Sequence, residues 1–174
     1  QKLEKLINSE LSSKIQNSSI TNDELMIEKL KKIEKVISSE LSSKIQNSSI
    51  KNDELLIEID EEDIIDVVQF LKSNENCKFK QLIDIAGVDY PENEKRFELV
   101  YLFLSHENNF RIKLLIKFQP TQSIHSLTKI FPSANWMERE VFDMYGIKFK
   151  NHPDLRRILT DYGFKGHPLR KDFP

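Results

Sequence analysis

Two histidines near the end of the chain are the first residues to test for chemistry, because imidazole is a frequent metal ligand and general base. His152 and His167 each precede a proline, and Asp154 and Asp161 lie between them. Their spacing of 15 positions runs through proline and glycine and matches no ligand pattern such as an i, i+4 pair on a helix. A metal-dependent hydrolase built on these side chains is therefore an unfavoured alternative.

Two carboxylates and one thiol are the remaining candidates for chemistry. Glu138 and Glu140 are two positions apart, so on a helix they point to different faces and do not form an acid–base pair. Cys77 is the only cysteine, whereas an iron–sulfur cluster needs several thiolates. No glycine-rich phosphate loop is present for a nucleotide cofactor. The sequence predicts no catalytic residue, no metal and no cofactor in this chain.

The stretch 146–174 differs in character from everything before it. It holds three of the four Gly, three of the six Pro, and seven Lys or Arg against three Asp, a net charge of +4. The stretch is too interrupted for one helix, yet each of its large apolar side chains would gain roughly 1.5–3 kcal/mol by burial. A segment of this kind orders best against a partner. We expect an extended basic arm that binds a locally acidic partner.

Arginine is scarce in this chain, and four of the six lie at or after Arg139. The planar guanidinium suits carboxylates, which makes Arg156, Arg157 and Arg170 candidates for ion pairs with a partner. Arg139 is instead a candidate to pair with Asp143, four positions later on its own helix. Solvated or intrachain charge stays an open alternative for each arginine. The candidate partner-interface residues are Arg156, Arg157, Arg170, His152, His167, Leu155, Phe164 and Phe173.

Length and overall charge narrow the class of protein. The 174 residues suffice for one domain, and the net charge of −2 favours neither nucleic acid nor an anionic membrane as a partner. No apolar run approaches the roughly 18 residues of a membrane span, and no cleavable secretory signal is visible. We therefore expect no direct membrane span and no nucleic-acid partner.

Strand patterns dominate the middle of the chain. Residues 82–89, 97–105 and 110–118 have the length and apolar content of strands. Leu55, Ile57 and Ile59 alternate with Glu54, Glu58 and Asp60, which indicates a half-buried strand. Residues 107–109 are a plausible hairpin turn. These patterns predict an α+β domain with a small, largely antiparallel or mixed sheet and helices packed on it.

Two helices are expected around these strands. Asp60 can cap the first, and Asn135 can cap the second with Glu138 as the third residue of a capping box. Gly146 can end the second helix. The expected buried faces comprise Ile64, Val67, Val68 and Leu71 in the first helix, and Met137, Val141 and Met144 in the second.

An internal repeat fills the first third of the chain. Residues 3–28 and 33–58 align with an offset of 30 and are identical at 21 of 26 positions. Two copies do not make a solenoid, so we interpret them as a recent tandem duplication that forms a tolerated helical extension, with docking of a partner as the alternative. Residues 25–32 are expected to join one long helix. The expected apolar helix faces are Leu3, Leu6, Ile7, Leu11 and Ile15 in the first copy, and Leu30, Ile33, Ile37, Leu41 and Ile45 in the second.

The last forty positions carry a specific motif. It reads Asn-Trp-Met-Glu-Arg-Glu-Val-Phe-Asp-Met-Tyr-Gly from Asn135, then His-Pro-Asp-Leu-Arg-Arg-Ile-Leu from His152, then Gly-His-Pro-Leu-Arg-Lys-Asp-Phe-Pro to Pro174. This closely resembles the thirty-kilodalton subunit of respiratory complex I, the C subunit of NADH:quinone oxidoreductase in bacteria and NADH dehydrogenase subunit 9 in mitochondria. The resemblance begins weakly near Asn52 and becomes near-verbatim from Pro132. The family normally has one copy of the front unit, and it usually continues past the Asp-Phe-Pro.

The resemblance implies a scaffold without its own cofactor. Such a subunit sits in the peripheral arm of the proton-pumping complex, against the large subunit that lines the quinone cavity and near the iron–sulfur subunits. Flavin and iron–sulfur clusters then belong to partner subunits, and the chain supports the quinone-binding module in electron transfer from NADH to quinone. A homologous subunit of a membrane-bound hydrogenase is the alternative.

The resemblance and the composition also suggest a location. The chain has 20 Lys against 6 Arg, and 20 Ile against 2 Ala, which indicates an AT-rich genome and suits an organelle. We expect the matrix side of the mitochondrial inner membrane, with the cytoplasmic side of a bacterial inner membrane as the alternative. The expected organisation is a helical extension over residues 1–51, an α+β core over 52–145 and the partner-binding arm over 146–174.

Overall fold

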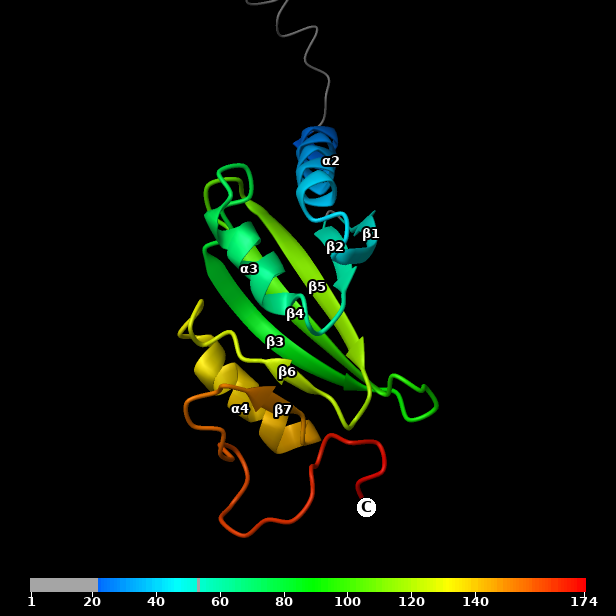
Figure 1. Cartoon of the computed structure of the whole chain (residues 1–174), viewed down its shortest axis with the longest axis vertical. Helices are drawn as coiled ribbons and strands as arrows, with labels where there is room; N and C mark the ends of the chain where they lie inside the picture. The colour runs from blue at the N-terminus through cyan, green and yellow to red at the C-terminus, as the bar shows by residue number, and fades with distance from the viewer. Residues whose placement is uncertain (1–21, 53) are drawn as a thin grey trace, which may run out of the picture.

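A five-stranded mixed sheet forms the centre of the molecule in this computed structural model, which describes residues 22–174 apart from residue 53 (Figure 1). Its strand order is β1-β2-β5-β4-β3, and β6 and β7 form a separate parallel pair. The strands are β1 (Ile45–Lys51), β2 (Glu54–Ile59), β3 (Gln81–Asp89), β4 (Phe97–Ser105), β5 (Phe110–Phe118), β6 (Ser123–His125) and β7 (Lys148–Lys150). The helices are α2 (Asn22–Glu40), α3 (Ile64–Ser73) and α4 (Ala134–Tyr145).

The expected α+β architecture is confirmed, including its central hairpin. β4 and β5 pair antiparallel along their whole length, and every second residue of each strand is buried. Asn109 has a φ of +55° in the connecting turn, a conformation that asparagine tolerates better than most residues. β2 runs parallel to β5, and the other neighbouring strands of the five-stranded sheet are antiparallel, so the sheet is mixed.

Helix α3 buries the face that its apolar spacing predicts. Ile64, Val67, Val68 and Leu71 are all buried in the core. The expected cap at Asp60 is wrong, because Asp63 is the residue that precedes the helix, and its side chain makes no capping hydrogen bond. The backbone carbonyl of Asp60 instead accepts a hydrogen bond from the Asp63 amide in the preceding turn.

The second repeat copy contains both helix and sheet. The expected face is confirmed for Leu30, Ile33, Ile37 and Leu41, which are buried. The helix ends at Glu40, however, and Ile45 begins strand β1 instead of a further helical turn. Asn47, Ser48 and Ser49, which favour caps and turns over helix interiors, follow soon after Ile45, and pairing with β2 satisfies their backbone groups. The expected helical extension over residues 1–51 is therefore wrong for residues 45–51, and the expected boundary at 51/52 falls inside the β1–β2 hairpin.

The first repeat copy falls largely outside the described residues, including its expected apolar face. The part of it that is described is helical, because α2 already begins at Asn22. This confirms that residues 25–32 join one long helix. Figure 1 shows α2 at one end of the molecule and the C-terminal segment at the other.

Helix α4 packs against β3 and leads into the C-terminal segment. Gly87 of β3 permits this approach, because a Cβ there would lie 2.8 Å from the Tyr145 ring. Gly146 ends α4 with a φ of +76°, as expected. The expected capping box is wrong: the helix begins at Ala134, Ser133 precedes it, and Glu138 points into the core. After β7, residues 151–174 contain no helix or strand.

Candidate partner-binding site

A buried carboxylate at the end of α4 organises the C-terminal segment. Asp143 Oδ2 accepts hydrogen bonds from the backbone amides of Ile158, Leu159 and Thr160 at 3.0, 2.8 and 2.9 Å. The Thr160 hydroxyl donates to Oδ1 at 2.7 Å. Burial alone would raise the pKa of Asp143, but the hydrogen bonds from Thr160, Leu159 and Ile158 hold the pKa below its usual value. The carboxylate therefore fixes a turn that has no regular secondary structure.

Arg157 completes this anchor. Its Nη1 lies 2.8 Å from Asp143 Oδ1, and its Nη2 donates to the Gly166 carbonyl at 2.8 Å. The guanidinium also lies over the Phe164 ring, 5.9 Å from the ring centroid. Arg157 thus makes intrachain contacts, which was the alternative that the sequence left open.

Arg139 and Arg156 shape the outer wall of this turn. The expected ion pair between Arg139 and Asp143 is wrong, because the Arg139 guanidinium donates instead to the carbonyls of Arg156 and Arg157, each at 3.0 Å. Both carboxylate oxygens of Asp143 already accept hydrogen bonds from residues 157–160. Arg156 pairs with Asp154 at 2.8 Å but stays largely exposed, with 71% of its side chain accessible. Arg156 is therefore open to a further partner.

A second anchor holds the last residues of the described chain. Asp89, at the end of β3, accepts two hydrogen bonds from Arg96 at 2.6 and 2.8 Å. The Lys171 amide donates to the same carboxylate at 2.7 Å, and Arg96 also reaches Asp172 at 2.9 Å. Arg170 pairs with Asp172 at 3.1 Å. Sequence reasoning missed Asp89 and Arg96 as anchors, because Lys171 and Asp172, the residues that they hold, lie 82 and 76 positions away.

The two candidate histidines hold different ends of α4. His152 Nε2 lies 3.0 Å from the Asn135 carbonyl in the first turn of the helix. His167 Nδ1 lies 2.9 Å from the Asp143 carbonyl in the last turn. The structure therefore does not bring the two imidazoles together. Within residues 22–174, residue 53 excepted, no three His, Cys, Asp or Glu side chains are grouped as a metal ion would require.

The candidate apolar residues divide into two groups. Leu155 packs against the core, and Phe173 is half-buried, with its ring 6.0 Å from that of Phe164. Phe164 is itself 38% exposed. Beyond the candidates, Leu159 is 61% exposed and Tyr162 fully exposed. The anchored backbone thus presents apolar side chains to the outside that its own domain does not cover.

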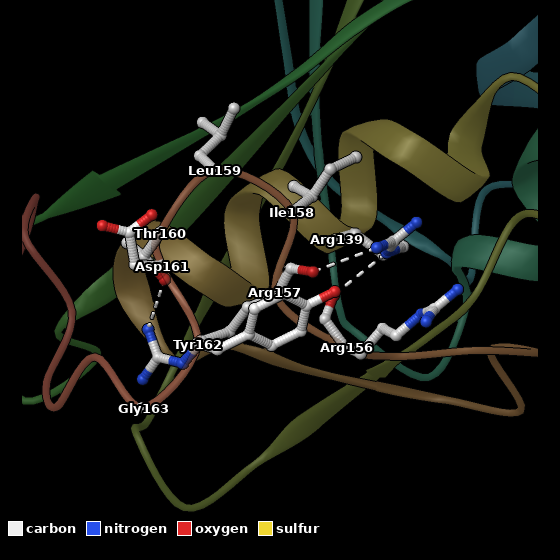
Figure 2. A pocket seen from close by; sticks show the side chains of 9 residues that line it. All are labelled: Arg139, Arg156, Arg157, Ile158, Leu159, Thr160, Asp161, Tyr162 and Gly163. Atoms are coloured by element: carbon white, nitrogen blue, oxygen red, sulfur yellow. Dashed lines mark hydrogen bonds between the residues drawn. The ribbon is translucent and has the colours of Figure 1, made fainter.

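A pocket of about 510 Å³ lies beside these side chains (Figure 2). Figure 2 shows Arg139 joined by two hydrogen bonds to the backbone of the 156–157 stretch, with Leu159 and Tyr162 on the same turn. The lining is Arg139 together with residues 156–163. We call this turn and its pocket the docking turn, defined as residues 156–163 with Arg139.

Glu138 lies inside the domain rather than in the docking turn. Its side chain is fully buried, Oε1 accepts the Leu127 amide at 2.7 Å, and Oε2 has no hydrogen-bond partner among the described residues. The buried His152 imidazole is 3.9 Å from Oε2. Burial raises the pKa of Glu138 to about 7. Glu140 is exposed, so the two carboxylates point apart as expected.

The fold and the anchored segment define a small α+β domain with a mixed sheet and an irregular C-terminal segment. One solved structure with this fold is the membrane-bound sulfane sulfur reductase, described as an archaeal respiratory membrane complex. One chain of it matches with a TM-score of 0.72 and 24% identity, over 83% of this chain and 85% of that chain. At this identity the likeness shows the fold alone.

The sequence match is more specific. The model of the family "Respiratory-chain NADH dehydrogenase, 30 Kd subunit" matches residues 57–174, and the chain belongs to this family. The C subunit of NADH-quinone oxidoreductase from Ruegeria pomeroyi is 56% identical over 117 residues, which are 67% of this chain and 58% of that protein. Its counterpart in Wolbachia sp. subsp. Brugia malayi is 57% identical over 113 residues, 65% of this chain and 60% of that protein. The chain thus spans about three fifths of the length of these relatives.

Proposed function

We propose that this chain is a subunit of the peripheral arm of a proton-pumping NADH:quinone oxidoreductase. In this role it carries no redox centre and no catalytic residue, and it supports the quinone-binding module by contact with its neighbours. Family membership supports the assignment to this complex. The 50–58% identity to the corresponding bacterial proteins supports it over the alternative of a membrane-bound hydrogenase.

The docking turn is the single observation that best supports a role in assembly. Its backbone is held by a buried carboxylate, yet Leu159 and Tyr162 point away from the domain and Arg156 stays accessible. Ordering these residues in the free chain lowers the entropy cost of binding, since little freedom remains to be lost. The exposed Leu159 and Tyr162 side chains fit an apolar area on a partner, and the exposed Arg156 fits an acidic side chain at the edge of that area.

The proposed partners are the large subunit that lines the quinone cavity and the iron–sulfur subunits near it. Flavin and iron–sulfur clusters are proposed to reside in those partners. Cys77, the only thiol, is buried, and its pKa is raised to about 11, so it favours the protonated form rather than a metal-binding thiolate. None of the helices in the described part of the chain is long and apolar enough to cross a membrane.

We propose attachment through these partners to the matrix side of the mitochondrial inner membrane or to the cytoplasmic side of a bacterial one. The compared relatives are bacterial. The mitochondrial location therefore rests on composition alone, and the bacterial location has the support of the relatives.

Affinity purification of the tagged chain from its own host in mild detergent tests the proposal. We expect the quinone-cavity and iron–sulfur subunits to co-purify, together with NADH:quinone oxidoreductase activity. The variant Leu159→Asp/Tyr162→Asp should keep its fold by circular dichroism and lose those subunits. Ser42→Asp, an exposed change in the turn between α2 and β1 and outside the docking turn, is the control and should retain them. Normal recovery of the complex with the double variant would count against docking through this turn.

A further inference from the structure

Two nearly identical segments of this chain have different secondary structures. Residues 24–28, Glu-Leu-Met-Ile-Glu, are helical within α2. Residues 54–58, Glu-Leu-Leu-Ile-Glu, form most of strand β2. They differ only at Met26 and Leu56, two residues of similar size and polarity. Local propensity therefore does not decide between the two structures, and the decision must come from tertiary contacts.

The second repeat copy occupies a defined place on the domain, which we call the repeat seat. It consists of β5 residues 112–117 together with Asp63 and Asp66 at the start of α3. Strand β2 pairs with β5 in parallel, with Leu55 opposite Ile112 and Ile57 opposite Leu114. Both β2 residues are completely buried.

Ion pairs fasten the same copy to the seat. Glu58 pairs with Lys117 at 2.8 Å, and Glu54 pairs with Lys113. Lys44 lies 3.1 Å from Asp63 and also pairs with Asp66. Each repeat-side residue of these contacts has a residue of the same type at the matching position of the first copy. The repeat-side residues Lys44, Glu54, Leu55, Ile57 and Glu58 correspond to Lys14, Glu24, Leu25, Ile27 and Glu28.

The contacts inside the second copy are duplicated as well. The Ser48 hydroxyl donates to Glu34 at 2.6 Å, and Ser18 and Glu4 are the same residue types in the first copy. Asn52 turns the β1–β2 hairpin with a φ of +50°, and Asn22 stands at the matching position. The first copy therefore contains the residues that this part of the fold requires.

The two copies differ at the position that directly follows the aligned repeat, which is buried in the second copy. Ile59 is the third inward residue of β2, only 1% exposed, and lies opposite Ile45 in β1. Its equivalent is Lys29, which is exposed on α2. Seating the first copy would place an ammonium group in the apolar core without a partner, which is strongly unfavourable. Leu30 lies outside the aligned repeat and is fully buried. Seating the first copy would therefore also remove Leu30 from its buried place.

We propose that the repeat seat is a binding site for either copy within the same chain, and that the pair Lys29/Ile59 selects the second. The chain then has two registers, thirty positions apart. In the alternative register residues 3–29 occupy the seat, and residues 30–59 form an insertion before α3. The entropy cost of that insertion grows only with the logarithm of its length, so the insertion does not forbid the exchange.

Exchanging the two selecting residues tests the proposal. Ile59→Lys alone leaves both copies with lysine at this position, so the melting temperature should fall. Adding Lys29→Ile should raise it again, because the first copy then carries the third apolar residue, although the loss of Leu30 burial keeps it below the wild-type value. Lys29 is exposed in the wild-type register. If the second copy always occupied the seat, Lys29→Ile would therefore not raise the melting temperature of the Ile59→Lys chain. Lys29→Gln with Ile59 retained is the matched control and should keep the wild-type behaviour.

Disulfide trapping reports which copy is seated. Glu58 lies opposite Leu115 in the β2–β5 pairing, and neighbouring strands are close enough for a disulfide. In a Cys77→Ser background, Glu58→Cys/Leu115→Cys should cross-link and Glu28→Cys/Leu115→Cys should not. In the Lys29→Ile/Ile59→Lys chain we expect the ratio of the two cross-links to shift by about 100-fold or more toward the first copy.

Three results would overturn the proposal. They are failure of Lys29→Ile to rescue Ile59→Lys, persistence of the Glu58 cross-link in the exchanged chain, and cross-linking between chains instead of within one. An exchanged chain that does not fold has failed the rescue, so this outcome also counts against the proposal.

Discussion

The Arg157 guanidinium and the Asp143 carboxylate are joined at 2.8 Å across 14 positions of sequence, and this pair separates the roles of two adjacent arginines. Arg157 points inward to the anchor, whereas its neighbour Arg156 points outward and is 71% exposed. The first is thus placed to stabilise the docking turn, and the second is accessible for the partner contact proposed above.

Asp143→Asn should destabilise the chain by about 3–5 kcal/mol, because it leaves Arg157 without its buried counter-charge. The same change should expose the amides of Ile158, Leu159 and Thr160 to hydrogen exchange. Urea unfolding and exchange measurements check both effects. Asp154→Asn removes an exposed partner of Arg156 and should change stability by less than about 1 kcal/mol. Equal effects of the two substitutions would contradict the anchor.

Charge reversal should have different effects on stability and on partner binding at Arg156 and at Arg157. Arg156→Glu should leave the unfolding transition of the isolated chain unchanged and weaken co-purification of the proposed partner subunits by about tenfold or more. Arg157→Glu should destabilise the isolated chain itself, since it places a second carboxylate against Asp143. Circular dichroism and native electrophoresis of the same variants distinguish the two outcomes. A stable Arg157→Glu chain would show that the intrachain pair contributes little.

Glu138 should make the stability of the domain depend on pH. Its pKa is raised to about 7 in the folded chain from an ordinary value of 4.5, so the folded state binds the proton more tightly than the unfolded state. Stability should therefore be highest below about pH 4.5 as far as this group is concerned, and should fall as the pH rises toward 7. Glu138→Gln should remove this dependence and stabilise the chain by about 3 kcal/mol above pH 7. Denaturant titrations at pH 5 and pH 8 measure the difference, with the exposed Glu140→Gln as a control that should show none.

Gly87→Ala should be among the most damaging small substitutions in the sheet. The added Cβ would lie 2.8 Å from the Tyr145 ring, so β3 and α4 would have to separate, at a cost of about 1–3 kcal/mol. Gly163 offers a matched comparison, because no atom lies within 4 Å of a Cβ added there and only its φ of +83° opposes alanine. Thermal unfolding of both variants should show the larger loss for Gly87→Ala.

Deleting residues 1–21 should leave a cooperatively folding domain. The buried residues of α2 begin at Leu30 among those described, and the second copy provides both strands of the β1–β2 hairpin. The truncated and full-length chains should show the same unfolding midpoint in denaturant. A lost transition would indicate that the first copy contributes to the core.

Local patterns in the sequence were sufficient for the elements that depend on neighbouring residues. The alternation in residues 97–105 and 110–118 predicts the β4–β5 hairpin, because side chains in a strand alternate between two faces. The apolar spacing of α3 and the glycine after α4 likewise predict a buried helix face and a helix end. The caps at Asp60 and Asn135 were wrong, since several nearby residues can begin a helix and core packing selects among them.

The sequence by itself determined the family, strands β2 to β5 and the place of the basic segment along the chain. Tertiary structure alone decided where that segment lies, because Asp143 and Asp89 hold it through partners 14 to 82 positions away, a distance at which no local pattern reports contact. It also decided which of two nearly identical segments became a strand. Residues 54–58 and 24–28 have nearly the same local preference, but Ile59 after the first is buried in the core whereas Lys29 after the second is exposed.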